Sequence, residues 1–234
     1  MTLAELQQTL ATLADPTDAA NLARYFQTGP GGYAEGDRFR GIRVPALRRL
    51  AKQARGLGLP DVTPLLTSAY HEDRLLALLI LVEQYRRGDA TQRAAIYRLY
   101  LSHTASINNW DLVDSSAGQI VGAHLYPDLL PTLEPLAASE SLWERRIAIM
   151  ATSYAIQQGR FDATLALAAR LRDDPHDLIH KAVGWMLREV GNRDRAVEEA
   201  FLQAHYRHMP RTMLRYAIEK FPEARRQAYL RGEV

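Results

Sequence analysis

Apolar residues recur at helical spacing along nearly the whole chain, and the pattern repeats about every 35 residues. Segments beginning near Glu72, Asn108, Leu142 and Asp177 are each followed by a break containing Gly, Asp or Pro and then by a second helical segment. Alternating β-branched strands and Asn-Gly or Asp-Gly turns are missing. Helix pairs at this period bury their apolar faces by stacking on the next pair. The sequence therefore predicts an all-α chain of stacked helix pairs.

The pairs lack the Trp/Gly/Tyr/Pro pattern of TPR repeats, so they favour a HEAT-like α-solenoid. We expect a single domain over residues 1–234, with a concave surface suited to an extended ligand. Stacking within one chain and the lack of a heptad seam predict a monomer. The expected helices are Leu3–Leu13, Thr17–Gln27, Pro45–Gly56, Asp61–Ser68, Glu72–Arg87, Thr91–Ser102, Ser106–His124, Pro127–Ala138, Leu142–Gln158, Asp162–Leu171, Asp177–Val190, Arg193–His208, Arg211–Lys220 and Pro222–Arg231. Pro45, Pro127 and Pro222 are expected in first helical turns, which accept proline.

The composition excludes several classes of protein. The chain has no cysteine, so disulfide scaffolds, Cys-type zinc sites, iron–sulfur clusters and thiol nucleophiles are excluded. The longest dense apolar run, Leu75 to Val82, is far shorter than the ~20 residues that cross a bilayer. No signal-peptide pattern is present at Met1–Leu10, so we expect an intracellular, cytoplasmic protein without membrane contact.

The charge balance leaves the partner open. The net charge is +2, from 29 basic and 27 acidic residues. Only Lys52, Lys181 and Lys220 are lysines, and all other basic residues are arginines. The planar guanidinium suits phosphate, but a GC-rich genome produces the same bias without any functional reason.

The segment from Thr28 to Asp37 interrupts the helical pattern, since it holds four glycines and a proline. It lacks the Gly-Lys-Ser/Thr ending of a P-loop and follows no strand, so a phosphate-cradling role is disfavoured. A connecting loop is the simpler interpretation, and a mobile loop that touches a bound ligand stays open.

The most unusual stretch is Asn108-Asn109-Trp110-Asp111-Leu112-Val113-Asp114. Trp110 and Asp114 stand at i and i+4, so they share one helix face. This spacing places a carboxylate beside an indole. Spacing alone favours the structural interpretation, in which Trp110 is a core residue and Asp111 or Asp114 is a solvated or capping acid.

A second candidate stretch runs from Lys181 to Val190. Lys181, Trp185 and Arg188 fall at i, i+4 and i+7, so two cations flank a tryptophan on one stripe. Cations interleaved with an aromatic ring are a signal for nucleic acid. The arginines after Trp143 are Arg145 and Arg146. Either they are ordinary surface residues, or one of them lies on the same side of the solenoid as Asp114 and Trp185.

His176-Asp177-Leu178-Ile179-His180 is similar to the zinc-binding H-E-x-x-H motif. The acid is Asp instead of Glu, and no third ligand is evident. We therefore expect no metal site, and a metallohydrolase using these histidines is a disfavoured alternative that chelator sensitivity would reveal.

Several motifs occur in a consistent order between Asn21 and Phe221: Arg24-Tyr25, Gly41-Ile42-Arg43-Val44-Pro45, Trp110-Asp111 with Val113-Asp114, Trp143 with Arg146, and Lys181-Ala182-Val183-Gly184-Trp185-Met186-Leu187-Arg188-Glu189. Together they resemble the AlkD-like DNA alkylation repair glycosylases, a family built from HEAT-like repeats. The last of these motifs, which ends with the residues Gly184 to Glu189, is the most specific of the set.

The resemblance implies base excision repair by hydrolysis of the N-glycosidic bond of cationic alkylpurines, such as 3-methyladenine and 7-methylguanine, in double-stranded DNA. It places the catalytic acid on Asp114 and the active-site tryptophans on Trp110 and Trp185. It places a backbone-contacting arginine on Arg146 and a tyrosine near the lesion on Tyr25. Such enzymes are described as working without drawing the base into a pocket, and they need no metal or cofactor.

The chemistry agrees with this set of residues. An alkylated purine is already cationic, so it leaves without a general acid, and one carboxylate suffices. A carboxylate at Asp114 would stabilise the developing sugar cation and hold a water, while the two indoles would attract that cation. Arg146 would fix phosphates, with Arg43, Lys181 and Arg188 as further candidates for DNA binding.

The sequence departs from the family pattern at two places. Asn109 stands where some members have an aromatic residue, and Gly29–Asp37 is an insertion relative to compact members. Some branches have lost the catalytic residues, which this chain retains. The alternative is a non-catalytic helical-repeat scaffold that binds a protein or branched DNA, and this scaffold would have the same fold.

Overall fold

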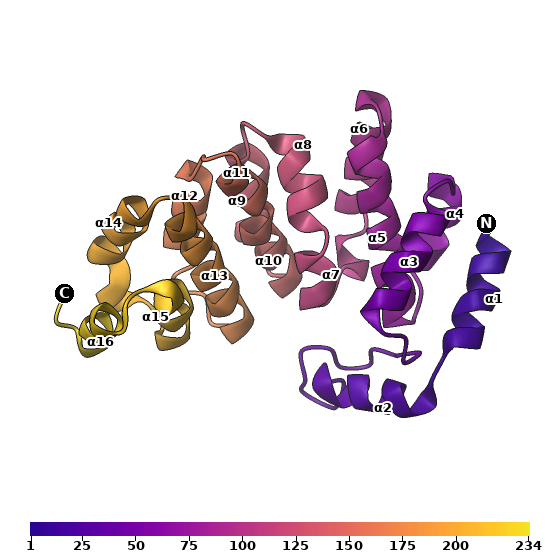
Figure 1. Ribbon diagram of the computed structural model, residues 1–234, viewed down its shortest axis with the longest axis horizontal. Helices are drawn as coiled ribbons and strands as arrows, with labels where there is room; N and C mark the ends of the chain where they lie inside the picture. The colour runs from indigo at the N-terminus through magenta and orange to yellow at the C-terminus, as the bar shows by residue number, and fades with distance from the viewer. The chain divides into compact units, whose positions relative to one another are not determined.

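The computed structural model describes residues 1–234 and is helical throughout, with one isolated bridge between Arg38 and Tyr70 as its only strand-like pairing. Figure 1 shows the helices in chain order. They form two compact units, residues 1–120 and 121–234, which are described separately. The single domain expected over residues 1–234 stays a prediction. No helix is both long and apolar enough to cross a membrane.

Unit 1 is organised around α5, whose first eleven residues are all buried. Helices α3 and α4 pack on α5, as do α6 and the short helix α7. The helices of this unit are α1 (Leu3–Leu13), α2 (Pro16–Tyr25), α3 (Val44–Ala54), α4 (Leu59–Leu66), α5 (His71–Arg87), α6 (Ala90–Leu101), η1 (Thr104–Ser106) and α7 (Trp110–Asp114).

Unit 2 is organised around α13, which packs on α10, α12, α14 and α15. Its helices are α8 (Ala123–Leu125), α9 (Leu130–Ala137), α10 (Leu142–Ala151), α11 (Ser153–Gln157), α12 (Asp162–Arg170), α13 (Asp177–Arg193), α14 (Arg195–His205), η3 (Tyr206–His208), α15 (Arg211–Ala217), η4 (Ile218–Lys220) and α16 (Glu223–Arg231). The π-turn η2 (Gly118–Gly122) spans the boundary of the two units.

The stacking within each unit confirms the predicted α-solenoid. In unit 1, α3, α5 and α7 pack in succession, and in unit 2, α10, α13 and α15 do the same. One helix of each pair therefore contacts a helix of the next pair, as expected for stacked helix pairs. Apart from Tyr25 at the end of α2, the predicted site residues lie on or directly before helices of these two rows.

Several predicted helices differ from the structure, and three of the differences concern the middle of the chain. The segment Ser106–His124 is broken into short pieces, and Gly122 approaches α10 so closely that a Cβ would lie 2.0 Å from the Ala151 carbonyl oxygen. Leu142–Gln158 is interrupted at Thr152, whose hydroxyl donates to the Ile149 carbonyl at 2.7 Å. Pro127 precedes α9 instead of opening it, and Pro131 lies in the first turn.

Candidate functional site

Helix α7 carries the tryptophan and the two carboxylates that the sequence singled out. It begins after the fully buried Asn109, whose Oδ1 accepts a hydrogen bond from the Trp110 backbone N–H at 2.8 Å. Trp110 and Asp114 are half-buried and lie one helical turn apart. The buried cap therefore fixes the start of the helix that presents both side chains.

An aromatic cluster surrounds Trp110. Its ring stacks on Phe26 with centroids 5.3 Å apart, and Phe26 stacks on Phe39 at 5.1 Å. Tyr25 meets Trp110 edge-on at 6.2 Å and is 65 % exposed. Trp110 is thus packed against other rings on one side, and a large aromatic side chain stands exposed beside it.

The glycine-rich segment contacts this cluster. The Trp110 Nε1–H donates a hydrogen bond to the Tyr33 hydroxyl at 3.2 Å. An indole N–H generally has a partner when it is withdrawn from water, and here the partner comes from the segment that interrupts the helical pattern. The segment is therefore part of the site as well as a connection between α2 and α3.

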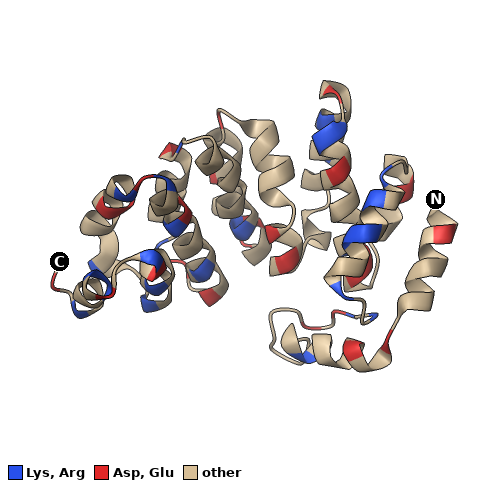
Figure 2. Ribbon diagram, in the orientation of Figure 1, with Lys and Arg blue, Asp and Glu red and all other residues tan.

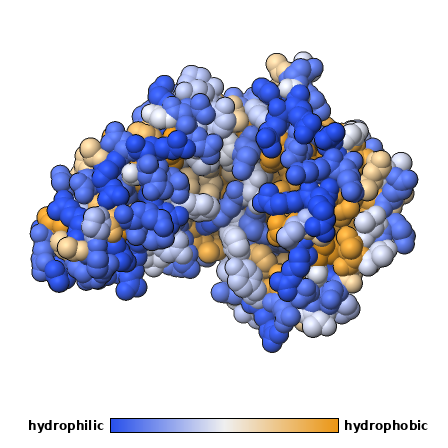
Figure 3. Space-filling model, viewed as in Figure 1, coloured by the Kyte–Doolittle hydropathy of each residue, from blue (hydrophilic) through white to orange (hydrophobic).

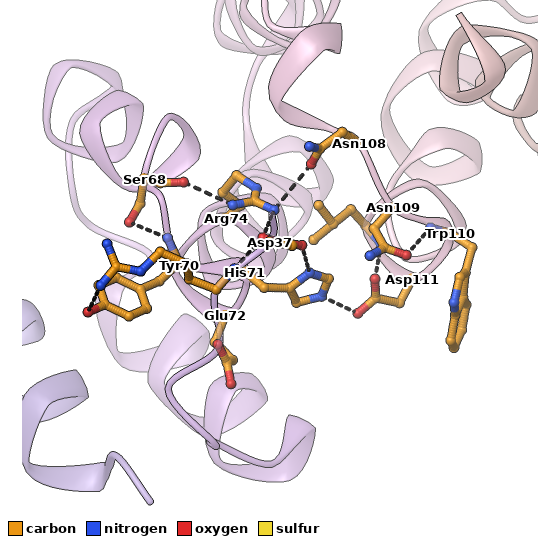
Figure 4. Close-up of polar contacts among 12 residues, drawn as sticks. Asp37, Ser68, Tyr70, His71, Glu72, Arg74, Asn108, Asn109, Trp110 and Asp111 are labelled. Atoms are coloured by element: carbon orange, nitrogen blue, oxygen red, sulfur yellow. Dashed lines mark hydrogen bonds and ion pairs between the residues drawn. The ribbon is translucent and has the colours of Figure 1, made fainter. Parts of the chain in front are cut away.

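A buried histidine links this segment to α7 (Figure 4). His71 Nδ1 lies 2.9 Å from Asp37 Oδ2, and its Nε2 lies 2.8 Å from Asp111 Oδ2. Burial alone would lower the pKa of His71, but the hydrogen bonds and charges of Asp111 and Asp37 outweigh it and raise the pKa to about 9. The imidazole is therefore an imidazolium at neutral pH, and it donates to both carboxylates.

Arg74 completes the buried cluster. Its guanidinium donates to Asp37 at 2.8 Å and to the side chain of Asn108 at 3.1 Å. Burial alone would raise the pKa of Asp37, but the hydrogen bond from His71 and the charge of Arg74 lower it. Two cations thus balance Asp37 and Asp111, and the cluster joins the glycine-rich segment, α5 and the start of α7.

Glu72 holds the chain that follows the glycine-rich segment. Its carboxylate accepts backbone N–H bonds from Arg40 and Gly41 at 2.8 Å and from Ile42 at 3.1 Å. Gly41 has φ of +85°, and a Cβ there would lie 2.0 Å from the Asp15 carbonyl oxygen. This close approach requires glycine and fixes the entry into α3.

The aromatic cluster borders a cavity of about 340 Å³ that lies entirely within unit 1. Tyr25, Arg43 and Trp110, three of the predicted site residues, line it together. Arg43 is ion-paired with Asp18 at 2.5 Å. The other lining residues are Leu22, Phe26, Phe39, Ile42, Val44, Arg48, His71, Glu72, Leu75, Asp111 and Ser115.

The environments of Asp111 and Asp114 distinguish the two acids. Asp111 is bonded to His71, so it is committed to the buried cluster. Asp114 is half-buried. Burial of the Tyr100 hydroxyl raises the pKa of Tyr100, and the negative charge of Asp114 raises it further. Asp111 therefore has a structural role, which favours Asp114 over Asp111 as the candidate acid.

In unit 2, α13 carries the second candidate stretch on one continuous helix. Lys181 Nζ lies 2.7 Å from Asp177, one turn earlier. The half-buried Trp185 donates its Nε1–H to Glu189 at 3.0 Å, one turn later. Lys181 and Trp185 therefore share the stripe predicted from spacing, and both have acidic partners on their own helix.

The two candidate arginines of unit 2, Arg146 and Arg188, have partners on other helices. Arg188 forms an ion pair with Glu219 of η4. Arg146 is only 4 % exposed, and its guanidinium donates to the Leu178 carbonyl at 2.5 Å, which joins α10 to the start of α13. Its contact with DNA phosphate stays a prediction.

Gly184 sets the distance between α13 and α15. A Cβ at this position would lie 2.4 Å from the Met213 carbonyl oxygen and 2.5 Å from the Tyr216 Cβ. Only glycine permits this packing without a shift of one helix. The glycine of the most specific sequence motif thus holds the helix that presents Trp185.

The two histidines of the zinc-like motif have structural roles. His176 caps α13, and its Nδ1 accepts the Leu178 backbone N–H at 3.1 Å. His180 Nε2 bonds the Asp174 carbonyl at 2.5 Å. No group of three or more potential metal-ligating side chains lies together.

Sequence reasoning missed the residues that support Trp110. They carry no motif and come together only through the fold. Phe26 meets Trp110 and His71 meets Asp111, while Phe39 stacks on Phe26 and Asp37 is bonded to His71. The one available signal was the position of His71 among charged residues at the start of an apolar helix. Tyr33 lay within the segment singled out for its glycines.

The comparison with known families decides the identity of the chain. The sequence model of the DNA alkylation repair enzyme family matches residues 6–221. The chain belongs to this family. The resemblance seen in the sequence motifs is thereby confirmed. No curated protein sequence matches the chain.

The chain is also similar to a solved structure described as a predicted DNA alkylation repair enzyme from Enterococcus faecalis. The TM-score is 0.68 over 90 % of this chain and 97 % of that chain, at 17 % sequence identity. At this identity the likeness supports the fold, and it agrees with the helix stacking. Membership of the DNA alkylation repair enzyme family gives the protein a role in the repair of alkylated DNA, with DNA as its partner.

Proposed function

We propose that the protein is a DNA glycosylase that hydrolyses the N-glycosidic bond of cationic N3- or N7-alkylated purines in duplex DNA. The observation that carries the proposal is the arrangement on α7. Trp110 is held by Tyr33 and Phe26, and the half-buried Asp114 follows one turn later. Asp111 is bonded to His71 within the buried cluster, and Asp114 is the other carboxylate of α7.

The proposed reaction needs one carboxylate. The C1′–N bond breaks and its electron pair leaves with the purine, which becomes neutral. The Asp114 carboxylate stabilises the positive charge that develops on the sugar. Water then adds at C1′ and gives its proton to Asp114, from which the proton passes to solvent. No cofactor is required for these steps.

The aromatic side chains act on the same developing charge. An indole face within about 6 Å of a cation contributes roughly 0.5–2 kcal/mol, more when water is excluded. Trp110 takes this role in unit 1, and the resemblance assigns the same role to Trp185 in unit 2. Each is tested by its own alanine variant.

The basic and polar candidates bind the DNA backbone. We assign Tyr25 and Arg43 of unit 1 to contacts near the lesion because both line the cavity beside Trp110. In unit 2, Lys181 and Arg188 carry cations along the Trp185 stripe, and Arg146 supports that helix. Phosphate contacts of this kind fix position without reading sequence.

A base-release assay separates the glycosylase from a non-catalytic scaffold with the same fold. The parent protein is incubated in excess with a duplex that contains a single 7-methylguanine, and free base is quantified. We expect release well above the spontaneous rate. Tight binding without release would favour the scaffold and contradict the proposal.

A further inference from the structure

A second cavity lies among the last helices of unit 2, and none of its lining residues has a role in the proposed reaction. Its volume is about 400 Å³, and it is formed by η3, the start of α15 and the end of α16. Three arginines line this cavity, which we call the arginine pocket, and no acidic residue does. The lining residues are Tyr206, Arg207, Met209, Arg211, Leu214, Tyr229, Leu230, Arg231 and Gly232.

Two of these arginines are held in place by bonds to neutral groups. Arg211 donates to the Leu230 carbonyl oxygen at 2.5 Å. Arg207 donates to the Tyr206 hydroxyl at 3.0 Å and to the Gly232 carbonyl oxygen at 3.5 Å. These contacts use one or two of the five N–H groups of each guanidinium. Both side chains therefore have a defined position and keep most of their donors for a further acceptor.

The arginine pocket is positive although negative groups lie near it. Glu233 pairs with Arg231 at 2.9 Å, and the Val234 main-chain oxygen accepts the Tyr206 hydroxyl at 2.6 Å. The C-terminal end of α16 adds a partial charge of roughly −0.5. The other two arginines are exposed and pair with no carboxylate, so their charges outweigh these groups. The planar guanidinium fork matches the geometry of a phosphate, which makes phosphate the anion that fits.

The arginine pocket adjoins the surface that carries Lys181. Thr212 follows Arg211 at the start of α15, and its side chain is hydrogen-bonded to Asp177, the ion-pair partner of Lys181. Burial alone would raise the pKa of Asp177, but the hydrogen bonds with Lys181 and Thr212 outweigh it and lower the pKa. Figure 2 shows Lys and Arg on α15 and α16, and Figure 3 shows a largely hydrophilic surface over the same helices. The starts of α13 and α15 therefore lie side by side.

We propose that the arginine pocket binds a phosphate of the DNA backbone away from the lesion, so that the DNA extends along unit 2 from Lys181 towards α16. The inference rests on the proposed function for its ligand, since it specifies how far the bound DNA reaches. A phosphate contact of this kind fixes the position of the DNA without reading its sequence. The competing interpretation is that the arginines only cap the carbonyl groups at the end of α16.

Charge-removing variants separate the two interpretations through the salt dependence of binding to an unmodified duplex. Glutamine can still donate to the Leu230 carbonyl, but it carries no charge. Arg207→Gln and Arg211→Gln should each reduce the slope of log K against log salt by about 0.9, and Arg211→Lys should keep the slope of the parent. The control is Arg193→Gln, an exposed arginine about 18 Å along α13 from Lys181, which should also keep it. Unchanged slopes in both pocket glutamine variants would overturn the proposal.

A second measurement leaves the protein unaltered and identifies the source of the phosphate. In ¹H–¹⁵N spectra of the parent protein, the Nε–H signals of Arg207 and Arg211 should shift when the unmodified duplex is added, and that of Arg193 should not. Inorganic phosphate is added in a parallel titration at equal ionic strength. Shifts caused by inorganic phosphate but not by the duplex would make the pocket a site for a free anion and would contradict the proposal.

Both measurements use binding alone and need no base release. A parent protein that shows the expected slopes and shifts but releases no 7-methylguanine would contradict the glycosylase proposal and support the arginine pocket. Release of 7-methylguanine with unchanged slopes and no shifts would support the glycosylase and contradict the pocket. The failure of one proposal is therefore distinguishable from the failure of the other.

Discussion

The two tryptophans assigned to the site are held in different ways. Trp110 lies on a helix of five residues and depends on distant segments, since Tyr33 accepts its indole N–H and Phe26 stacks on its ring. Trp185 lies in the middle of a helix of 17 residues, and its indole N–H is bonded to Glu189 on the same helix. Unit 1 positions its tryptophan by tertiary contacts, and unit 2 does so mainly by local helix geometry.

The difference extends to the charges around each tryptophan. In unit 1, His71, Arg74, Asp37 and Asp111 form a buried cluster that joins three segments. In unit 2, the cations of the Trp185 stripe pair with more exposed acids. Removing one member of a buried cluster leaves an unpaired charge, whereas an exposed pair contributes little. We therefore expect unit 1 to be the more sensitive to loss of a single polar group.

The largest expected effect is that of His71→Gln. It leaves Asp37 and Asp111 buried without the imidazolium, so the free energy of unfolding should fall by about 3–5 kcal/mol. The measurement is urea unfolding at pH 6. His208→Gln, which changes an exposed histidine of unit 2, should alter stability by no more than about 0.5 kcal/mol. A similar loss in both variants would contradict the buried-cluster account.

The same cluster predicts a pH dependence. The pKa of His71 is about 9 in the folded protein, and its reference value is 6.5. Its contribution to stability is therefore fully present below pH 6.5 and is lost as the pH rises through 9. Urea unfolding between pH 6 and 9.5 should show this decline in the parent, and the His71→Gln variant should lack it.

The packing of unit 2 is tested by Gly184→Ala. The added Cβ would lie 2.4 Å from a backbone oxygen of α15, so one helix must shift, at a cost of about 1–3 kcal/mol. Gly56→Ala in unit 1 has open space around the new Cβ and serves as the control in the same unfolding measurement. An unchanged stability of Gly184→Ala would show that α13 and α15 adjust freely.

The tertiary support of Trp110 is tested by Tyr33→Phe, which removes a single hydroxyl group. A hydrogen bond contributes a net free energy of about 0.5–1.5 kcal/mol. Its loss should reduce the rate of base release roughly 2- to 10-fold and leave the DNA affinity unchanged. One of the three indole N–H signals in a ¹H–¹⁵N spectrum should shift, that of Trp110. With Tyr216→Phe as the control, no shift in the Tyr33→Phe spectrum would disprove the contact.

The smallest effect on stability is expected for Lys181→Gln, because its pair with Asp177 is exposed. The stability should change by less than about 1 kcal/mol. If Lys181 binds a phosphate as proposed, the salt slope of DNA binding should decrease by about 0.9. A salt slope equal to that of the parent protein would show that Lys181 pairs with Asp177 and does not bind a phosphate.

Many helices were predicted close to their observed bounds because their periodicity, and in some of them a capping residue, is visible in the local sequence. The helix beginning at Leu3 agrees at both ends, and the long helix ending at Arg87 differs by one residue at its start. The segment Ser106–His124 was wrong as a single helix because Gly122 packs against another helix, a contact that no local pattern contains.

The candidate site was only partly predictable for the same reason. Trp110, Asp114 and Trp185 were found through motifs that resemble a family. His71 was not found because its two carboxylate partners are 34 and 40 residues away in the sequence. The role of Tyr33 likewise depends on a contact across 77 residues, so only the fold reveals it.

The most direct test of the account is single-turnover release of 7-methylguanine by Asp114→Asn. Asparagine keeps the shape of the side chain but lacks the charge that faces the developing sugar cation, so the rate should fall about 10²–10³-fold. DNA affinity should be nearly unchanged, since it depends on phosphate contacts. A rate equal to that of the parent protein would show that Asp114 is not the catalytic carboxylate and would contradict the proposed mechanism.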